Sequence, residues 1–372
     1  MFMQIGFDAK RAFCNRSGLG NYARATIRKM IEFYPDEDYY LFTPDVHLHD
    51  FEYEVTGMAK IVRPQGMYKY CTPLWRSRAM SADWRKLNIN IYHGLSNELP
   101  VLRNKTRCIV TIHDLIFLRY PQFYNPIDRK IYLSKTKYAC ENADAIVAVS
   151  QQTKEDIVDY LNISPEKISV IYQDCSDVFA QQTSRVKALE VKQRYGLPQD
   201  YMIAVGTIEE RKNQLAILKA LDRLDERPHI VFVGKSTAYK KKLKRFMKTY
   251  RLDKYVTFLE GVPDDDLPAL YQSANGFLYV SEFEGFGIPL LEAMKSKVPI
   301  ITSSVSCLPE TAGDAALLVN PAKPEEIAEA IQKINSDSDI CKALIEKGSE
   351  QLMKFDPKNN ISRLMKLYQS VI

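Results

Sequence analysis

The sequence predicts an α/β protein with two doubly wound parallel sheets, each in its own domain. Runs rich in β-branched and aromatic residues alternate with longer amphipathic runs along the chain, which is typical of parallel strands joined by helical crossovers. The 372 residues exceed the length of one ordinary domain. The polar segment 173–185 interrupts the alternation near the middle of the chain and is therefore the predicted linker.

The expected strands fall into two groups, one on each side of this linker. The first group lies near 3–7, 39–43, 59–63, 89–92, 108–112, 145–149 and 168–172, and the second near 201–205, 229–233, 256–259, 276–280, 298–302 and 315–319. Helices are expected in most of the intervals, among them 213–223, 239–250, 264–273 and 324–335. Two such domains facing each other would place one cleft at the carboxyl ends of both sheets, where folds of this class bind ligands.

The chain ends on a further expected helix, which follows a break at KFDPKNN. Its apolar residues recur at helical spacing: Ile361, Leu364, Met365, Tyr368 and Ile372. We expect this helix to cross back and pack on the first domain. The predicted domains are therefore 1–178 together with 357–372, and 179–356.

Composition and charge exclude several classes of protein. The 46% hydrophobic and 26% charged content is that of a soluble globular chain, and a net charge of +5 is too small to indicate nucleic-acid binding. Seven scattered cysteines, none spaced C-x-x-C, favour reduced thiols in a cytoplasmic protein over disulfides or a zinc site. The start MFMQIGFDAKR lacks the apolar core of a signal peptide, and no apolar run approaches the ~20 residues that span a bilayer, so membrane contact is expected to be peripheral.

The stretch GLGNYA, residues 18–23, has the G-x-G-x-x-A spacing of a dinucleotide-binding turn. Such a turn needs its first glycine directly after the first strand, so that a pyrophosphate meets the helix N-terminus. Here the ten residues AKRAFCNRSG run from the expected end of the strand near Asp8 up to and including Gly18, which argues against a dinucleotide site. Two alternatives stay open: a flexible turn before a helix, or a glycine loop that lines the cleft.

The strongest chemical signal lies in residues 279–310. An expected strand, 276–280, leads into a glycine-rich turn and then into a helix from about Gly287. Helix N-termini are ready anion sites, and glycines let a phosphate approach the backbone. Glu284 lies in the turn, where it could bond sugar hydroxyls, and Glu292 lies in the helix, where it could bond a ribose diol.

This segment, EGFGIPLLEAM, resembles the donor-binding signature of the family-4 glycosyltransferases, which are retaining enzymes with the two-domain GT-B fold. Further stretches resemble other motifs of the family in the same order: GFDAKRAFCNRSGLGNYARA, VTIHDL, ADAIVAVSQQTKEDI, VGTIEERKN and VPIITSSVSCLPETAGDAALLVNP. The resemblance covers nearly the whole chain and is weakest at about 44–88. It implies an N-terminal acceptor-binding domain and a C-terminal donor-binding domain.

The resemblance also implies roles for individual residues of the second domain. Lys212, with Arg211 beside it, would hold the diphosphate of the donor, Glu284 would contact its hexose, and Glu292 its ribose. The backbone amides of three residues would cradle phosphate: Phe286, Gly287 and Ile288. Gly206 and Leu291 complete the predicted donor-binding set. The sequence departs from the family at Thr207, where many members have an arginine, and Arg211 is the cation that could compensate.

In the first domain, His113 follows an expected strand within TIHDL, which resembles the family motif whose histidine lies at the reacting sugar. His113 would then hydrogen-bond the sugar or polarise the leaving group, and the alternative is a satisfied histidine at a strand end. Asp114 is expected to orient loops. His93 also ends a strand, and two interpretations stay open: it lines the acceptor side, or it has no part in acceptor binding. Gly18 and Gly20 are interpreted as a flexible lid that approaches the donor phosphates or the acceptor.

We expect no essential metal and no cofactor, because Arg211 and Lys212 can stabilise the charge of a departing diphosphate. The D-x-D in PDDDLP, 263–268, is better explained as the start of a helix. The two histidines of DVHLHD, 45–50, have no third soft ligand nearby. By analogy with the family, substitution occurs on the face from which the phosphate departs, with Glu284 positioning the donor and not acting as nucleophile.

Two basic segments suggest surface contacts. The segment 67–86 combines both tryptophans, Trp75 and Trp84, with Arg76, Arg78, Arg85 and Lys86. Such a mixture suits a membrane interface that carries a lipid-linked acceptor, and the alternative is buried aromatics with outward-facing bases. The run KKKLKRFMK, 240–248, is interpreted as the solvated face of a helix.

The sequence thus predicts a cytoplasmic, metal-independent, retaining hexosyltransferase of polysaccharide or glycolipid assembly, with a place at the inner face of the cell membrane open. TIEERKN resembles the T-L-E-P-R-K-N loop of mannosyltransferases, which favours GDP-mannose over a UDP-sugar. The acceptor is expected to be a saccharide or a lipid-linked saccharide. Three alternatives stay open: a sugar-nucleotide epimerase of the same fold, a non-catalytic nucleotide-sugar-binding protein and an NAD-dependent oxidoreductase.

Overall fold

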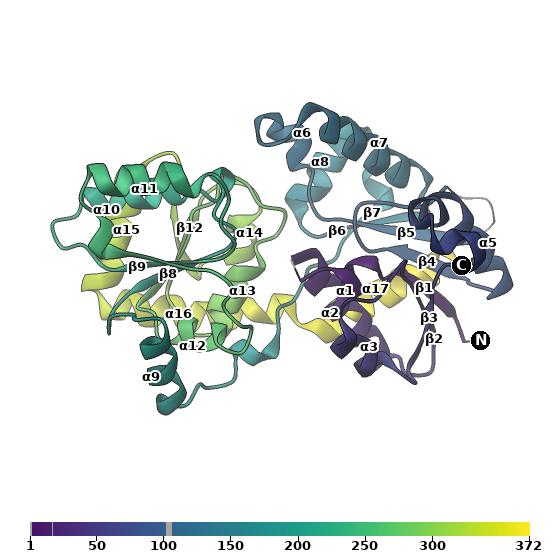
Figure 1. Ribbon diagram of the computed structural model, residues 1–372, viewed down its shortest axis with the longest axis horizontal. Coiled ribbons are helices and arrows are strands. Elements are labelled where there is room, and N and C mark those ends of the chain that lie inside the picture. The colour runs from purple at the N-terminus through teal and green to yellow at the C-terminus, as the bar shows by residue number, and fades with distance from the viewer. Residues whose placement is uncertain (1, 17, 102–105) are drawn as a thin grey trace. The chain divides into compact units, whose positions relative to one another are not determined.

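A computed structural model describes residues 2–16, 18–101 and 106–372. The chain divides into two compact units, Met1–Asp174 with Phe355–Ile372, and Cys175–Lys354 (Figure 1). The chain leaves the first unit within the polar segment expected as the linker, at Asp174 rather than at 178, and returns to it at Phe355 rather than at 357.

The first unit is built on a sheet of seven parallel strands in the order β3-β2-β1-β4-β5-β6-β7. The strands are β1 (Gln4–Asp8), β2 (Asp38–Phe42), β3 (Ala59–Val62), β4 (Ile91–Gly94), β5 (Arg107–Ile112), β6 (Ala145–Ala148) and β7 (Ile168–Val170). The strand order reverses between β1 and β4, and this doubly wound order brings the carboxyl ends of β1, β4 and β5 to one edge of the sheet. All strands expected in this half of the sequence are confirmed.

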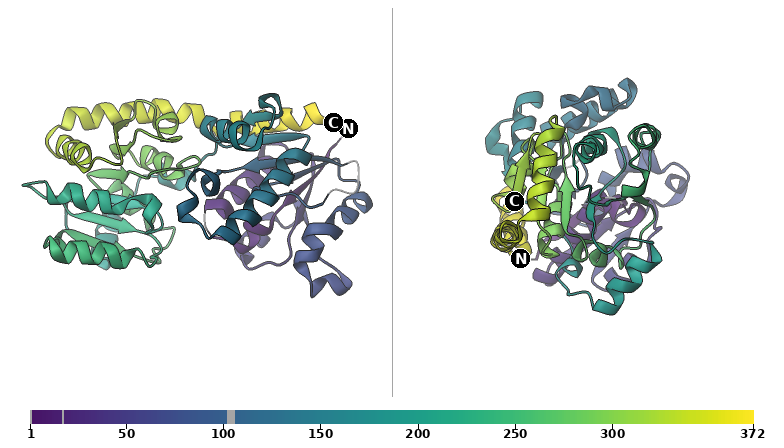
Figure 2. Two further views of the ribbon diagram at one scale, coloured as in Figure 1. Left: turned by 90° about the horizontal axis from the view of Figure 1, so that it is seen from above. Right: turned by 90° about the vertical axis from the view of Figure 1, so that its left-hand side faces the viewer.

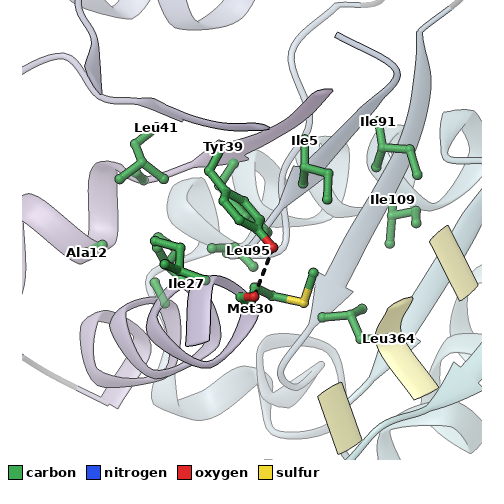
Figure 3. Packing of buried hydrophobic residues seen from close by; sticks show 14 of the residues in the cluster. Ile5, Ala12, Ile27, Met30, Tyr39, Leu41, Ile91, Leu95, Ile109 and Leu364 are labelled. Atoms are coloured by element: carbon green, nitrogen blue, oxygen red, sulfur yellow. Dashed lines mark hydrogen bonds between the residues drawn. The ribbon is translucent and has the colours of Figure 1, made fainter. Parts of the chain in front are cut away.

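Helices cover the sheet of the first unit. They are α1 (Lys10–Cys14), α2 (Gly18–Phe33), α3 (His49–Val55), α4 (Thr72–Leu74), α5 (Met80–Lys86), α6 (Ile116–Arg119), α7 (Pro126–Asn142), α8 (Gln151–Leu161) and α17 (Pro357–Val371). On one face, side chains of α2 and α17 pack against β1, β4 and β5, as Ile27, Leu364 and Ile109 show (Figure 3). The Tyr39 hydroxyl, which reaches into this core, donates to the Met30 carbonyl at 2.8 Å. The apolar face of α2 is therefore buried, and the Tyr39 hydroxyl of β2 has a hydrogen-bond partner in this core.

Helix α17 packs on the first unit, as its apolar spacing predicts. Its first turn is capped by Asp356, whose carboxylate accepts from the Asn359 N–H at 2.8 Å. Four of the five expected apolar residues are buried in the core of the first unit: Ile361, Leu364, Met365 and Tyr368. Ile372 lies beyond the helix end at Val371 and is exposed, so its place in the buried stripe was wrong.

The glycine stretch 18–23 is not a flexible lid, because it forms the first turns of α2. Gly20 is buried, and a side chain there would place its Cβ 1.9 Å from the Asn15 carbonyl oxygen. A Cβ at Gly18 would meet nothing within 4 Å. Gly20 therefore permits the close packing of α2 against the end of α1, which is a structural reason for the second glycine of the motif.

The second unit contains six parallel strands in the order β10-β9-β8-β11-β12-β13. The strands are β8 (Met202–Val205), β9 (Ile230–Val233), β10 (Val256–Leu259), β11 (Gly276–Tyr279), β12 (Ile300–Ser303) and β13 (Ala316–Val319). The helices are α9 (Arg185–Arg194), α10 (Gln214–Asp222), α11 (Lys240–Thr249), α12 (Leu267–Gln272), α13 (Ile288–Lys295), α14 (Leu308–Ala312), α15 (Pro324–Ser336) and α16 (Ser338–Leu352), and they lie on both faces of the sheet (Figure 2). The strand order reverses between β8 and β11, so this is the point at which such a sheet binds ligands.

Within the described part of the chain, no helix is both long enough and apolar enough to span a bilayer.

Candidate functional site

Three charged side chains meet where β8 and β11 end. Arg211 and Lys212 lie in the 3₁₀ helix η6 (Glu210–Lys212), which follows β8, and Glu284 lies in the loop after β11. Glu284 Oε1 is 2.6 Å from Lys212 Nζ, and Glu284 Oε2 is 2.8 Å from Arg211 Nη1. The structure therefore brings the adjacent residues Arg211 and Lys212 together with the sequence-distant Glu284, and it does so at the switch point of the sheet.

Further hydrogen bonds fix both cations. Arg211 Nη1 donates to the Phe283 carbonyl at 2.7 Å, and Nη2 donates to Glu209 at 2.6 Å. Lys212 Nζ donates to the Tyr279 hydroxyl at 2.7 Å and lies 4.7 Å from the centre of the Tyr279 ring. Each cation thus has several partners, which holds its charged group in one position.

Glu284 remains ionised although the cluster is largely buried. Burial alone would raise the pKa of Glu284, but the adjacent Arg211 and Lys212 outweigh it and lower that pKa to about 2. Burial lowers the pKa of Lys212, and Glu284 opposes that shift. Glu284 is therefore a carboxylate at neutral pH, which suits it to accept hydrogen bonds from hydroxyl groups.

Two glycines keep the backbone beside this cluster bare. Gly206, at the end of β8, has φ 141°, and Gly234, at the end of β9, has φ 151°. A Cβ at Gly234 would lie 2.0 Å from the Gly206 carbonyl oxygen, and one at Gly206 would lie 3.4 Å from Lys212 Cε. Gly206, predicted to contact the donor, therefore lies directly beside the Lys212 side chain, where only glycine leaves this space open.

Helix α13 begins beside the same loop. Gly287 is its N-cap with φ 94°, and a Cβ there would lie 3.0 Å from Leu308 Cδ2. The amides of Gly287 and Ile288 precede the first intrahelical bonds of α13 and form, with the helix dipole, an anion-binding end. Phe286 is buried, and its carbonyl accepts from the Thr311 hydroxyl at 2.6 Å, which fixes the turn.

Leu291 does not line the site with its side chain. The residue is fully buried under α13 and belongs to the hydrophobic interior of the second unit. A donor contact through the Leu291 side chain is therefore excluded, because the residue is one turn along the helix on the inward face. The neighbouring Glu292 is on another face of the helix and is only partly buried.

Glu292 is poised between its two protonation states. The Tyr271 hydroxyl donates to its Oε2 at 2.9 Å. Burial raises the pKa of Glu292 to about 7, further raised by Asp264 and opposed by the Tyr271 hydrogen bond. A small change in its surroundings, such as two hydroxyls donating to it, would therefore remove its proton at neutral pH.

His113 is buried at the end of β5 in the first unit. Its Nε2 donates to the Leu95 carbonyl at 2.9 Å, and Gln173 Nε2 donates to its Nδ1 at 3.4 Å. Burial lowers the pKa of His113 to about 4, so the ring is neutral at pH 7. Both ring nitrogens thus have protein partners, as in the satisfied-histidine alternative.

His93 is a core residue and does not line an acceptor surface. It is fully buried, its Nδ1 is 2.6 Å from the Tyr368 hydroxyl of α17, and its Nε2 is 2.8 Å from Thr111 Oγ1. Burial lowers its pKa to about 3. The sequence left this question open, because a histidine at the end of a central strand can point into the packed face as readily as toward a ligand.

Asp114 orients a loop, in agreement with the prediction. Its carboxylate accepts from the Ile116 N–H at 3.1 Å at the start of α6.

The D-x-D segment also has a structural role. Asp266 is buried at the start of α12, and its carboxylate accepts hydrogen bonds from Lys187 and Arg194 of α9 and from Tyr195, which follows α9. Asp266 therefore ties α9 to α12.

The two histidines near residue 48 are exposed and pair with acids close in sequence, His47 with Asp45 and His49 with Glu52, each at 3.0 Å. In the described ranges, no group of three or more His, Cys, Asp or Glu side chains is placed to hold a metal ion. The basic helix α11 buries Leu243 and Met247, while its lysines face outward, as expected for a solvated face.

The tryptophans of 67–86 are not membrane anchors. Trp75 and Trp84 are both buried in a cluster on the second face of the first sheet, and Trp75 Nε1 donates to Asp83 at 3.0 Å. Arg76 turns inward to an ion pair with Asp8. Other side chains of this segment are exposed, among them Met67, Lys69, Tyr70, Leu74, Arg78, Arg85 and Lys86.

Comparison with known proteins fits this arrangement. The family described as "Glycosyltransferase Family 4" matches residues 17–173, and the family "Glycosyl transferases group 1" matches residues 188–351. The chain is also 32% identical over 288 residues to "O-antigen chain mannosyltransferase B" of Escherichia coli, which covers 75% of this chain and 74% of that protein. The chain is a glycosyltransferase of this family. The epimerase, binding-protein and oxidoreductase alternatives have no support among these matches.

Two further similarities agree with the assignment of the chain to this family. The chain is 28% identical over 279 residues to "O-antigen chain mannosyltransferase RfbU" of Salmonella typhimurium, and the matched part covers 75% of this chain and 73% of that protein. The crystal structure of Anabaena Alr3699/HepE in complex with UDP matches with a TM-score of 0.75 over all of both chains at 15% identity. The latter likeness concerns the fold and confirms the GT-B architecture.

Two tyrosines of the glycosyltransferase site were missed by sequence reasoning. Tyr279 ends β11 beneath Lys212, and Tyr271 lies on α12 against Glu292. The position of Tyr279 at a strand end was a usable signal, because carboxyl strand ends present ligand-site residues. Tyr271 carried no such signal, because only the packing of α12 beside α13 brings it to Glu292.

Proposed function

We propose that this glycosyltransferase moves mannose from GDP-mannose to a saccharide or lipid-linked saccharide acceptor, in polysaccharide assembly. The observation that carries the proposal is the Arg211–Glu284–Lys212 cluster beside the N-terminus of α13. The mannosyltransferase relatives support the sugar, and the TIEERKN loop that contains both cations supports the donor.

The proposed chemistry follows from the charges that develop as the donor reacts. Breaking the glycosyl–phosphate bond places negative charge on the departing nucleoside diphosphate. Arg211 and Lys212, together with the amides at Gly287 and Ile288, lie where they could stabilise this charge without a metal ion. Because these groups are already fixed by protein contacts, little reorganisation would accompany the reaction.

The carboxylates have different proposed roles. Glu284 accepts hydrogen bonds from the hexose hydroxyls and places the sugar, and Glu292 binds the ribose diol. Glu284 is held between two cations, which lowers its basicity and makes it a weak nucleophile. We therefore propose retention of configuration by attack on the face from which the phosphate departs, with that phosphate taking the acceptor proton.

His113 is proposed to act as a neutral hydrogen-bonding residue near the sugar. Its low pKa is unsuited to general acid catalysis at neutral pH. Its backbone N–H donates to Asn97 Oδ1 at 2.8 Å, so the strand end that carries it is tightly held. Contact with a sugar through Nδ1 would require Gln173 to give up a long, 3.4 Å hydrogen bond.

A thermal-shift panel of GDP, UDP, ADP, dTDP and NAD tests the donor. GDP is expected to raise Tm most, since a ligand at about 100 times its Kd adds about 2.7 kcal/mol to stability. Mannose transfer from GDP-mannose is then followed by NMR of the product. We expect an α-linkage from the α-configured donor, and we expect the rate to be unchanged in EDTA. Stabilisation by another nucleotide alone would reject the donor, an inverted product would reject retention, and loss of activity in EDTA would reject metal independence.

Peripheral contact with the inner face of the cell membrane is proposed for the segment 67–86, now through its exposed side chains. Met67, Tyr70 and Leu74 offer apolar surface beside Arg78 and Arg85, a combination that suits an anionic lipid surface. Co-sedimentation with anionic vesicles is expected and should be lost when both arginines are changed to alanine. Binding that is unchanged by this double substitution would contradict the proposal.

A further inference from the structure

A pocket of about 420 Å³ lies in the first unit, beside the carboxyl end of β1. Its volume is in the range of small-molecule sites, about 300–1,000 Å³. Five parts of the chain line it: the end of β1 with the start of α1, Pro44 after β2, the segment 72–80, the loop after β4 and the middle of α7. The pocket is thus formed within one unit and by residues that the tertiary structure brings together from distant positions.

A chain of four alternating charges crosses this pocket. Arg76 Nη2 is 2.6 Å from Asp8 Oδ2 and 2.8 Å from Glu98 Oε1, and Lys135 Nζ is 2.9 Å from Glu98 Oε2. Asp8 is only 4% exposed. Burial opposes the ionisation of Glu98, but Arg76 and Lys135 lower its pKa to about 2. Glu98 is therefore a carboxylate at neutral pH.

Both carboxylates can accept more hydrogen bonds than the described residues supply. A carboxylate has about four acceptor positions. Asp8 accepts from the Lys10 N–H at 3.2 Å and from Arg76, while Glu98 accepts from Arg76 and Lys135. Each group thus has acceptor capacity for ligand hydroxyls at the wall of the pocket.

The charge pattern favours a neutral, hydroxyl-rich ligand over an anion. Among the described residues, three cations line the pocket, and two of them, Arg76 and Lys135, are already paired with carboxylates. The third, Lys10, has a lowered pKa because of burial and the nearby Arg76. Saccharide hydroxyls can donate to the carboxylates and accept from the cations, whereas a phosphate would lie against two negative groups.

The remaining wall has the apolar surfaces that a sugar ring needs. Tyr138 of α7 lines the pocket, as do three prolines and two aliphatic side chains: Pro44, Pro73, Pro100, Met80 and Leu99. These groups can cover the C–H faces of a pyranose while the charged chain binds its hydroxyls. Polar and apolar surfaces therefore occur together, as in sites for small polar molecules.

We propose that this pocket binds a sugar residue of the acceptor, with Asp8 and Glu98 accepting hydrogen bonds from its hydroxyls. The inference rests on the proposed transferase function. Asp8 ends β1 and Glu98 follows β4, at the sheet edge where His113 follows β5. This is the edge at which a parallel sheet presents its ligands.

Saturation-transfer NMR on the full chain tests the pocket directly. Four disaccharides serve as probes, with non-reducing mannose, glucose, galactose or N-acetylglucosamine. At least one is expected to bind, with affinity at least tenfold weaker in Asp8→Asn and in Glu98→Gln. Glu52→Gln, which removes a partly exposed, ion-paired carboxylate elsewhere in the same unit, is the matched control and should bind as the unaltered protein does.

Stability and competition separate binding from a purely structural role. Lys135 is largely exposed, so Lys135→Met should fold even where the Asp8 variant does not, and it should weaken saccharide binding measurably. Inorganic phosphate should not compete with the sugar. Binding of none of the four disaccharides, equal binding in folded Glu98→Gln and Lys135→Met proteins, or displacement by phosphate would overturn the proposal.

The nucleotide panel distinguishes this inference from the proposed function. Asp8→Asn and Glu98→Gln should bind GDP as the unaltered protein does, because both residues lie in the first unit. Saccharide binding lost in these variants, without any nucleotide binding in the unaltered protein, would support the pocket and reject the transferase mechanism. Normal mannose transfer from GDP-mannose, combined with saccharide binding that is unchanged in Asp8→Asn and Glu98→Gln, would support the transferase mechanism and reject the pocket.

Discussion

At the scale of single residues, Glu284 is the centre of the candidate donor site. It is buried and yet ionised, because Arg211 and Lys212 hold its two oxygens at 2.8 and 2.6 Å. The same three groups would face a sugar diphosphate with one carboxylate for hydroxyls and two cations for phosphate. Removing Glu284 leaves both cations without the carboxylate they share, and removing either cation leaves Glu284 with one cation in place of two.

We expect Lys212→Ala and Glu284→Ala each to lower kcat/KM by about 10²-fold or more, the scale of losing a fixed electrostatic contact in a water-poor site. Steady-state kinetics with GDP-mannose measures this. Lys219→Ala, which removes an exposed lysine of the neighbouring α10, is the control and should be fully active. Near-normal activity of either site variant would reject its role, and a trapped glycosyl–Glu284 adduct would reject same-face substitution.

Glu292 leads to a prediction about pH. With its pKa near 7, it gains a proton as the pH falls from 8 to 6, and a protonated carboxyl is a poorer acceptor for a ribose diol. GDP affinity is therefore expected to weaken by up to about tenfold over this interval, in proportion to the ionised fraction. Isothermal calorimetry at several pH values measures the affinity.

Glu292→Gln is the matched variant for this test, since it keeps the shape of the side chain and removes its titration. Its GDP affinity should be weaker at pH 8 and nearly independent of pH. A pH dependence that is as steep in Glu292→Gln as in the unaltered protein would assign the effect to another group.

At the scale of elements, the contact between α1 and α2 depends on one glycine. Gly20→Val would force a side chain against the Asn15 carbonyl, which a Cβ would approach to 1.9 Å. We expect this variant to destabilise the first unit by at least about 2 kcal/mol, on the scale of severe overpacking. Denaturant unfolding measures the loss.

Gly18→Ala is the control for the same turn, because a Cβ there meets nothing within 4 Å. It should be neutral or slightly stabilising, as expected for alanine in a helix. Equal stability of Gly20→Val and the unaltered protein would show that α2 begins differently. That result would support the interpretation of residues 18–23 as a flexible lid.

At the scale of the whole molecule, the last helix completes the first unit. The chain leaves that unit at Asp174 and returns at Phe355, and α17 then buries Leu364 among side chains of β1, β4 and β5 (Figure 3). The Tyr368 hydroxyl beside His93 adds a polar contact inside this core. The first unit therefore needs the end of the chain.

Leu364→Ala is expected to destabilise the first unit by about 2–5 kcal/mol, the usual cost of a cavity left by a buried leucine. Calorimetry should show a lower transition for this unit, while GDP binding by the second unit persists at temperatures below that transition. Ile372→Ala, at the exposed end, should change neither. A Tm unaffected by Leu364→Ala would contradict the packing of α17.

Much of the architecture was predictable because it depends on local pattern. Parallel strands that are buried on both faces form continuous apolar runs, and turn residues separate them from amphipathic helices, so strand positions and the linker could be predicted. The acids and cations of the donor site could be located through EGFGIPLLEAM and VGTIEERKN. The sequence could not decide whether the side chains of Leu291, His93 and the tryptophans are buried, because sequence spacing does not tell which face of an element meets the core.

The sequence by itself determined the two doubly wound units, the return of the last helix and the membership of a glycosyltransferase family. Only the tertiary structure decided that Glu284 is clamped between Arg211 and Lys212, that Gly20 is a packing residue, and that Asp8 shares a pocket with Arg76 and Glu98. The physical reason is that local periodicity and capping act over a few residues, whereas burial and charge pairing depend on side chains from distant parts of the chain meeting at one place.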